Sequence, residues 1–135
     1  MIVLDTSAVI EFTRGNQRLT DIVKSAEETG DVVAVTSVTL FELLTPIFHK
    51  SMAKKERVLR ALLHNVPVLK LDETASEESA KIMSALLKVG RPANVLDVLI
   101  AGIAVANGVE LLIGTDADLT EISKVVSSLK IELLQ

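Results

Sequence analysis

The sequence predicts an α/β fold: a single three-layer α/β/α domain in which a five-stranded parallel sheet lies between helices. Short apolar segments alternate with helical segments, an order typical of parallel strands joined by right-handed crossovers. The apolar run of residues 32–35 has no polar alternation, which favours a strand covered on both faces. The length of 135 residues fits one domain over residues 1–135, and no Gly/Ser-rich stretch divides it.

The first part of the chain predicts a strand, two helices and a second strand. Residues 1–4 (MIVL) form a short buried strand, and the helix after it is capped by Asp5, Thr6 or Ser7. The next helix closes at Gly30, and it is indicated by the i, i+3, i+4, i+7 spacing of Leu19, Ile22, Val23 and Ala26. Residues 32–35 (VVAV) form the second strand.

The middle of the chain contains a proline that disturbs a helix. We expect Ser37 to cap a helix that carries Glu42. Pro46 cannot donate to the carbonyl of Glu42 and clashes with it. The helix therefore kinks near Glu42 or ends there, with Thr45–Pro46 opening a second helix. Residues 54–64 are then helical, and residues 66–71 (VPVLKL) form the third strand.

The last part predicts two long helices, a strand, a short helix and an edge strand. Asp72 starts a helix that runs to Gly90 with Ala75, Ile82, Met83, Leu86 and Val89 facing inward. Asn94 caps the helix of residues 95–108, which is apolar nearly all round and should be buried. Residues 109–113 form the fourth strand, a short helix lies near Leu119, and residues 129–133 alternate like an edge strand.

Composition excludes several classes of protein. With no cysteine, disulfides and thiol chemistry are absent, and the nearly apolar run of residues 98–106 is too short to span a membrane. No basic region precedes the apolar N-terminal residues, so we expect no signal peptide and a cytoplasmic protein. The net charge of −4 argues against non-specific coating of nucleic acid but leaves a nuclease open.

Basic residues cluster within residues 50–60. Lys50, Lys54 and Arg57 have i, i+4, i+7 spacing and are expected to share a helix face with either a solvated or a binding role.

Four acidic residues follow or interrupt apolar runs: Asp5, Glu42, Asp97 and Asp116. Ligands of open parallel sheets bind outside the carboxyl ends of the strands, and Asp5 and Asp116 meet there if the first and fourth strands are neighbours. Two carboxylates about 4 Å apart repel by about 4 kcal/mol at an effective dielectric near 20. Some of these acids are therefore protonated, with raised pKa values, or cations lie between them.

The cation that suits this set is Mg²⁺ or Mn²⁺, because both prefer carboxylate and water ligands. A zinc site is not expected, since there is no cysteine and both histidines lie outside the set. Two such metals would serve phosphodiester hydrolysis. Thr6, Ser7 and Thr115 stand beside the acids, where they could hydrogen-bond a metal-bound water or a phosphate.

Each acid also has a structural interpretation. Asp5 and Asp116 could cap helices, and Thr39-x-x-Glu42 and Asn94-x-x-Asp97 resemble capping boxes. Asp118 could be a first-turn carboxylate favoured by the helix dipole. Phe41 and Phe48 are i, i+7 and indicate core residues or a dimer contact.

The chain resembles the PIN domain family, and within it the VapC-type ribonuclease toxins. The matching segments are VLDTSAVIE, TSVTLFELL, residues 96–119 and the final strand. The resemblance implies a Mg²⁺- or Mn²⁺-dependent endoribonuclease that acts on RNA, forms a homodimer and is inhibited by a cognate antitoxin. By position, Asp5, Glu42, Asp97 and Asp116 match the acidic quartet of the family. Thr6 and Ser7 match its hydroxyl positions, and Asp118 matches a further acid.

The sequence departs from the family pattern at two positions: Leu119 stands where a Phe often follows Asp118, and Gly114 stands where a hydroxyl residue is usual, with Thr115 next to it.

Two other functions stay open. The first is a phosphotransferase that forms an aspartyl-phosphate on Asp5, although Ser7 stands where a second Asp is usual and Lys124 is the one candidate for a lysine partner. The second is a non-catalytic module of the same fold that binds RNA or a protein.

Overall fold

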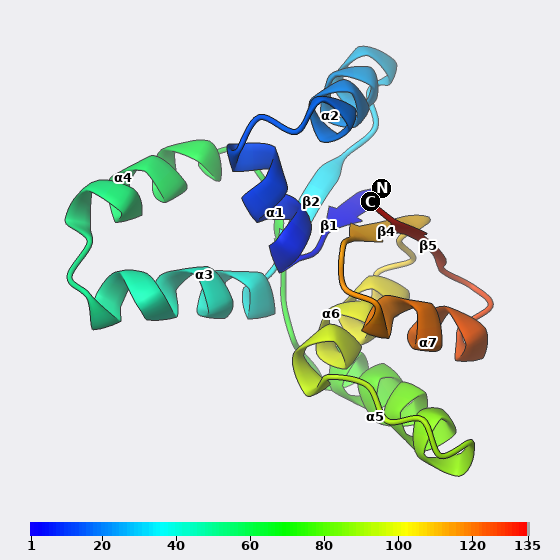
Figure 1. Ribbon diagram of the computed structural model, residues 1–135. Helices are drawn as coiled ribbons and strands as arrows, with labels where there is room; N and C mark the ends of the chain where they lie inside the picture. The colour runs from blue at the N-terminus through cyan, green and yellow to red at the C-terminus, as the bar shows by residue number, and fades with distance from the viewer. Residues whose placement is uncertain (135) are drawn as a thin grey trace.

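The computed structural model describes residues 1–134 and has the predicted three layers (Figure 1). The central sheet is parallel throughout, with strand order β3-β2-β1-β4-β5. Its strands are β1 (Ile2–Leu4), β2 (Val33–Thr36), β3 (Val68–Leu69), β4 (Leu111–Gly114) and β5 (Lys130–Leu133). The third strand is much shorter than expected because hydrogen bonding to β2 is confined to two residues.

Seven helices connect these strands within residues 1–134. They are α1 (Thr6–Thr13), α2 (Gln17–Thr29), α3 (Ser37–His49), α4 (Ala53–Leu62), α5 (Glu73–Lys88), α6 (Val95–Ala106) and α7 (Asp118–Val125). Among the same residues, no helix combines the length and apolar character that crossing a membrane requires.

The two faces of the sheet have separate cores. On one face α6 packs against both the sheet and α5, and its residues Ile100, Ala101 and Ile103 are at most 1% exposed. Helix α5 approaches α6 so closely that a Cβ on Gly102 would overlap with Ser79. On the other face α1 and α2 cover Leu4, Val35 and Ile113. The expected burial of the helix from Asn94 onward is therefore confirmed.

The strand order places the site. β1 pairs with both β2 and β4, so Val3 lies opposite Ala34 on one side and Leu112 on the other. Asp5 follows β1 directly, and Asp116 comes two residues after β4 ends. The condition on which the predicted convergence depended, that the first and fourth strands are neighbours, is therefore met.

Helices α3 and α4 form an arm that extends away from the sheet (Figure 1). The arm turns at Ser51, whose φ of 51° lies in the left-handed region. The helix that contains Pro46 continues without interruption from Ser37 to His49, so the interpretation of a second helix opening at Thr45–Pro46 is wrong. Thr45 directly precedes the proline, and its hydroxyl donates to the carbonyl of Phe41, one turn earlier in α3, at 2.7 Å.

Several local expectations are corrected. Thr36, not Ser37, caps α3, because its hydroxyl accepts from the Thr39 N–H. Val89 is 60% exposed, since α5 ends at Lys88 and the helical period stops there. Phe41 and Phe48 are 60% and 57% exposed, so they are not core residues.

The expected shared face of Lys50, Lys54 and Arg57 is also wrong. Lys50 follows the last residue of α3 as its C-cap, whereas Lys54 and Arg57 belong to α4.

Candidate metal centre

Asp5 is the most deeply placed acid of the site. It ends β1, is 2% exposed and caps α1, with its Oδ1 accepting from the Ala8 N–H at 2.8 Å and from the Ser7 hydroxyl at 2.6 Å. Burial raises the pKa of Asp5 above its ordinary value, and the carboxylates of Glu42 and Asp116 raise it further, whereas the two hydrogen bonds act in the opposite direction. Asp5 is thus a helix cap and also a charge that lies close to other acids.

Gly114 makes room for the Asp5 carboxylate. A Cβ at this position would overlap with Oδ2 of Asp5 and with a methyl group of Leu119. The absence of a side chain at residue 114, where the family pattern has a hydroxyl, therefore lets β4 approach Asp5 closely.

Ser7 connects the two loops that carry Asp5 and Asp116. Its hydroxyl donates to Oδ1 of Asp5 and accepts from the Thr115 N–H at 2.9 Å. Thr115 is joined to the site through its backbone in this contact, rather than through the side chain that the sequence suggested.

Glu42 enters the site from α3. Its Oε1 accepts from the Thr6 hydroxyl at 2.6 Å, and the Thr6 hydroxyl is also 3.1 Å from that of Thr39, which is fully buried. The pair Thr6–Glu42 fixes the start of α1 against α3. Sequence reasoning assigned Thr39 to a capping box and missed this contact, which joins residues 33 positions apart.

Asp97 lies in the first turn of α6 and is 9% exposed. Its Oδ2 is buried and has no hydrogen-bond partner among residues 1–134. Burial is the main cause that raises the pKa of Asp97 to about 7, followed by the charge of Asp116 and a hydrogen bond with it; the charges of Asp5 and Glu42 add to the rise. A buried carboxylate in this state either keeps its proton or needs a cation beside it.

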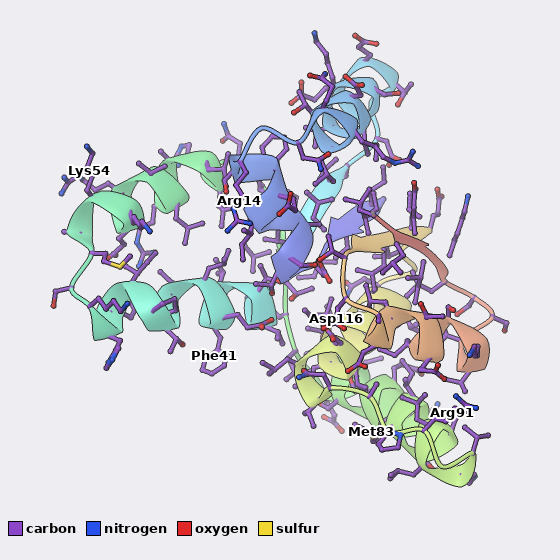
Figure 2. The ribbon with its side chains drawn as sticks, viewed as in Figure 1. Arg14, Phe41, Lys54, Met83, Arg91 and Asp116 are labelled. Atoms are coloured by element: carbon purple, nitrogen blue, oxygen red, sulfur yellow. The ribbon has the colours of Figure 1, made fainter. Side chains whose placement is uncertain are left out.

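Asp116 in the loop after β4 and Asp118 at the start of α7 complete the cluster. One oxygen from each of Asp97, Asp116 and Asp118 lies within 4.8 Å of the others. Asp116 also accepts from the Asp118 N–H at 2.9 Å, and Asp118 accepts from the Asn94 N–H at 2.7 Å. The second contact ties α7 to the start of α6, and Figure 2 shows Asp116 where these two helices approach α1. Sequence reasoning treated Asp118 as peripheral, but it belongs to the tightest acidic group.

The residues present fit a divalent cation. The donors are all carboxylate oxygens, which hard cations prefer, and the buried Oδ2 of Asp97 lacks any partner that would satisfy it among the described residues. Asp97, Asp116 and Asp118 are therefore able to hold one ion, with Asp5 and Glu42 close enough to act on the same charge.

A comparison with models of protein families shows to which family the chain belongs. The model of the PIN domain family matches residues 2–125. The chain belongs to the PIN domain family. A curated relative, Ribonuclease VapC3 of Methanocaldococcus jannaschii, is 31% identical to this PIN domain over 101 residues, which are 75% of the chain and 95% of the relative.

Solved structures share the same fold. The structure of VapBC2 from Rickettsia felis, bound to a DNA fragment from its promoter, matches this PIN domain with a TM-score of 0.82 and 17% identity, covering 100% of both chains. The structure of VapBC-1 from nontypeable Haemophilus influenzae matches with a TM-score of 0.79 and 24% identity, covering 98% of both chains.

Proposed function

We propose that this PIN domain is a metal-dependent endoribonuclease, the toxin of a type II toxin–antitoxin pair that acts in the cytoplasm. The observation that carries the proposal is the buried, unpartnered Oδ2 of Asp97 beside Asp116 and Asp118. The relative named Ribonuclease VapC3 supports RNA as the substrate, and the VapBC structures support an antitoxin as partner. The domain is proposed to span residues 1–135.

The resident ion is proposed to be Mg²⁺ or Mn²⁺, held by Asp97, Asp116 and Asp118 with Asp5 and Glu42 alongside. When bound, such an ion activates water and stabilises the charge that develops on a phosphodiester during hydrolysis. The chain supplies the rest. Ser7 and the Ala8 N–H fix the Asp5 carboxylate, and Thr6 fixes Glu42. Because its pKa is raised to about 7, the Asp97 carboxyl is protonated in about half of the molecules at pH 7, and a bound cation would displace that proton.

The geometry disfavours an aspartyl-phosphate on Asp5. Oδ1 of Asp5 accepts two hydrogen bonds, and Oδ2 packs against Gly114, so neither oxygen is open to a phosphorus atom. The candidate lysine also lies elsewhere, since Nζ of Lys124 is 3.2 Å from Glu121 on the exposed side of α7.

A homodimer is part of the proposal, and its contact surface is formed by exposed apolar side chains. Phe41 and Phe48 lie two turns apart on α3, and they are 60% and 57% exposed. Sedimentation of the wild-type protein should give the mass of two chains, whereas the Phe41→Glu variant should give the mass of one chain.

Incubation with RNA tests the activity. The purified protein should cleave members of an RNA panel when Mg²⁺ or Mn²⁺ is present and stop when EDTA is added. Asp97→Asn should reduce the rate by about 10²-fold or more, because the site loses a ligand and its charge. Asp21→Asn, which changes an exposed acid on α2, should leave the rate unchanged. Full activity of a folded Asp97→Asn variant would refute the proposal.

A further inference from the structure

The α3–α4 arm carries basic residues that the acidic site does not use. Between Glu42 and Asp72 the chain has one acid, Glu56, and six basic residues: Lys50, Lys54, Lys55, Arg57, Arg60 and Lys70. Because the whole chain has 14 basic and 18 acidic residues, this segment is strongly positive and the remainder is strongly negative. The net charge of −4 therefore hides a separation of charge within the molecule.

Four of the positive charges of the arm are free of internal partners. Lys50, Lys54, Lys55 and Arg57 are exposed and form no ion pair with any residue in 1–134. The single acid of α4 is already occupied, since Glu56 accepts from Arg60 at 2.8 Å. A polyanion that reaches the arm would thus meet unpaired cations.

Helix stability does not explain where these residues stand. Lys54 and Lys55 occupy the first turn of α4, where positive charge opposes the helix dipole, and Met52 provides no side-chain cap. Leu59 is buried on the inner side of α4, whereas Lys54 and Arg57 lie one turn apart on the opposite side. Figure 2 shows Lys54 directed away from α3. The arrangement is unfavourable for the helix alone and suits an external ligand.

The arm starts at the acidic site. Glu42 lies in α3, and Lys50 follows it by eight residues, which is about 12 Å along a helix. At about 3.4 Å per nucleotide of a stacked strand, that distance corresponds to roughly four nucleotides. A strand held at the acids therefore reaches Lys50 within a few nucleotides and continues toward Lys54 and Arg57 on α4.

We propose that Lys50, Lys54 and Arg57 bind the phosphate backbone of the RNA strand whose scissile phosphate lies at the acidic cluster. This inference rests on the proposed ribonuclease function and adds the surface that holds the substrate. An acidic body repels RNA, so the arm is the part of the chain that attracts it and guides it to the site.

Binding of a labelled single-stranded RNA of about 20 nucleotides tests the proposal. The background is Asp97→Asn, so that the RNA stays intact, and the arm variant combines Lys50→Gln, Lys54→Gln and Arg57→Gln. The control combines Lys24→Gln, Lys88→Gln and Lys130→Gln, which removes three exposed charges from α2, α5 and β5. Both triple variants have the same net charge, so a difference between them reports the position of the charges.

The arm variant should bind RNA about tenfold or more weakly at low salt, and the control should change by less than about twofold. The slope of log K against log salt should become shallower by about 2 in the arm variant, at about 0.7 per phosphate contact. Equal weakening by both triple variants, or unchanged binding by the arm variant, would overturn the proposal. An arm variant that binds RNA normally but no longer binds the antitoxin would assign the arm to the protein partner instead.

Cleavage of a trinucleotide separates this proposal from the proposed function. By the same spacing, a trinucleotide held at the acids is too short to reach Lys50, Lys54 or Arg57, so the wild-type protein and the arm variant with Asp97 restored should cleave it equally. If the wild-type protein cleaves no RNA while arm-dependent binding is observed, the ribonuclease proposal fails and the RNA surface stands. If the trinucleotide is cleaved but binding of the longer RNA is independent of the arm, the ribonuclease stands and the surface fails.

Discussion

At the scale of single residues, Asp97 is the most unfavourable group in the metal-free protein. Its carboxyl is 9% exposed, one oxygen lacks a partner within residues 1–134, and four neighbouring acids share the same end of the sheet. The apolar helix around it offers no compensating cation. The residue therefore reduces stability unless a proton or a metal ion neutralises it.

Asp97→Asn should stabilise the metal-free protein at pH 8. In the folded state the pKa of Asp97 is about 7, compared with 3.8 for an ordinary Asp, so the folded protein binds more protons between these values. Stability consequently falls as the pH rises through this window, by up to about 1.4 kcal/mol for each unit. The asparagine is neutral throughout and escapes the loss.

Urea unfolding in EDTA at pH 5 and pH 8 checks this prediction. The advantage of Asp97→Asn over wild type should amount to a few kcal/mol at pH 8 and should be much smaller at pH 5. Asp21→Asn should stay within about 0.5 kcal/mol of wild type at both pH values. An Asp97→Asn protein that is no more stable than wild type at pH 8 would show that the charge is already compensated.

At the scale of elements, Asp118 joins two helices as well as adding charge. Its Oδ2 accepts from the Asn94 N–H, so α7 is held at the start of α6, beside Asp97. Asn94 in turn caps α6 by accepting from the Leu96 N–H. The loop after β4 and the start of α6 are thus positioned by one short chain of hydrogen bonds.

Replacing Asp118 separates its two roles. Asp118→Asn keeps an oxygen that can accept from Asn94, so its unfolding free energy should change little. Asp118→Ala loses the hydrogen bond and should cost about 1 kcal/mol. Both variants should bind Mn²⁺ more weakly, because both lack the negative charge. If Asp118→Asn binds Mn²⁺ as wild type does, Asp118 acts as a structural link alone.

Elements with strong local signals could be predicted from the sequence. Asp72, Asn94 and Gly30 bound their helices as expected, because each cap depends on residues a few positions away. Ser37 was expected to cap α3, but Thr36 beside it also carries a hydroxyl, and the exact end of β2 decides that Thr36 accepts from Thr39. Pro46 is retained inside α3, so the helix continues despite the backbone hydrogen bond that the proline cannot donate.

Contacts between distant segments were harder to predict. The spacing of apolar residues gives no strand order, and the gathering of the acids depends on β1 lying between β2 and β4. The link between Asp118 and Asn94 and the close approach of Gly114 to Asp5 arise from that packing. A glycine in place of a family hydroxyl was visible in the sequence, but its purpose became clear from the side chain it accommodates.

At the scale of the whole molecule, charge is divided between two regions. The carboxyl end of the sheet collects acids from the residue after β1, from α3 and α6, from the loop after β4 and from the start of α7. The arm carries the basic residues of positions 50–60. The first region needs a cation, and the second attracts an anion. A divalent ion at the acids would remove the repulsion that otherwise keeps a phosphate away from them.

Calorimetric titration of Mn²⁺ tests the central claim, that these acids form one cation site. Wild-type protein should bind Mn²⁺ and release about half a proton at pH 7, because the Asp97 carboxyl must lose its proton when the ion binds. At pH 8.5 almost no proton should be released, because Asp97 is already ionised. Titrations in buffers of different ionisation enthalpy measure the number of protons released. Asp97→Asn should bind at least about tenfold more weakly, and Asp21→Asn should match wild type. Equal Mn²⁺ affinity in Asp97→Asn and wild type would contradict the claim.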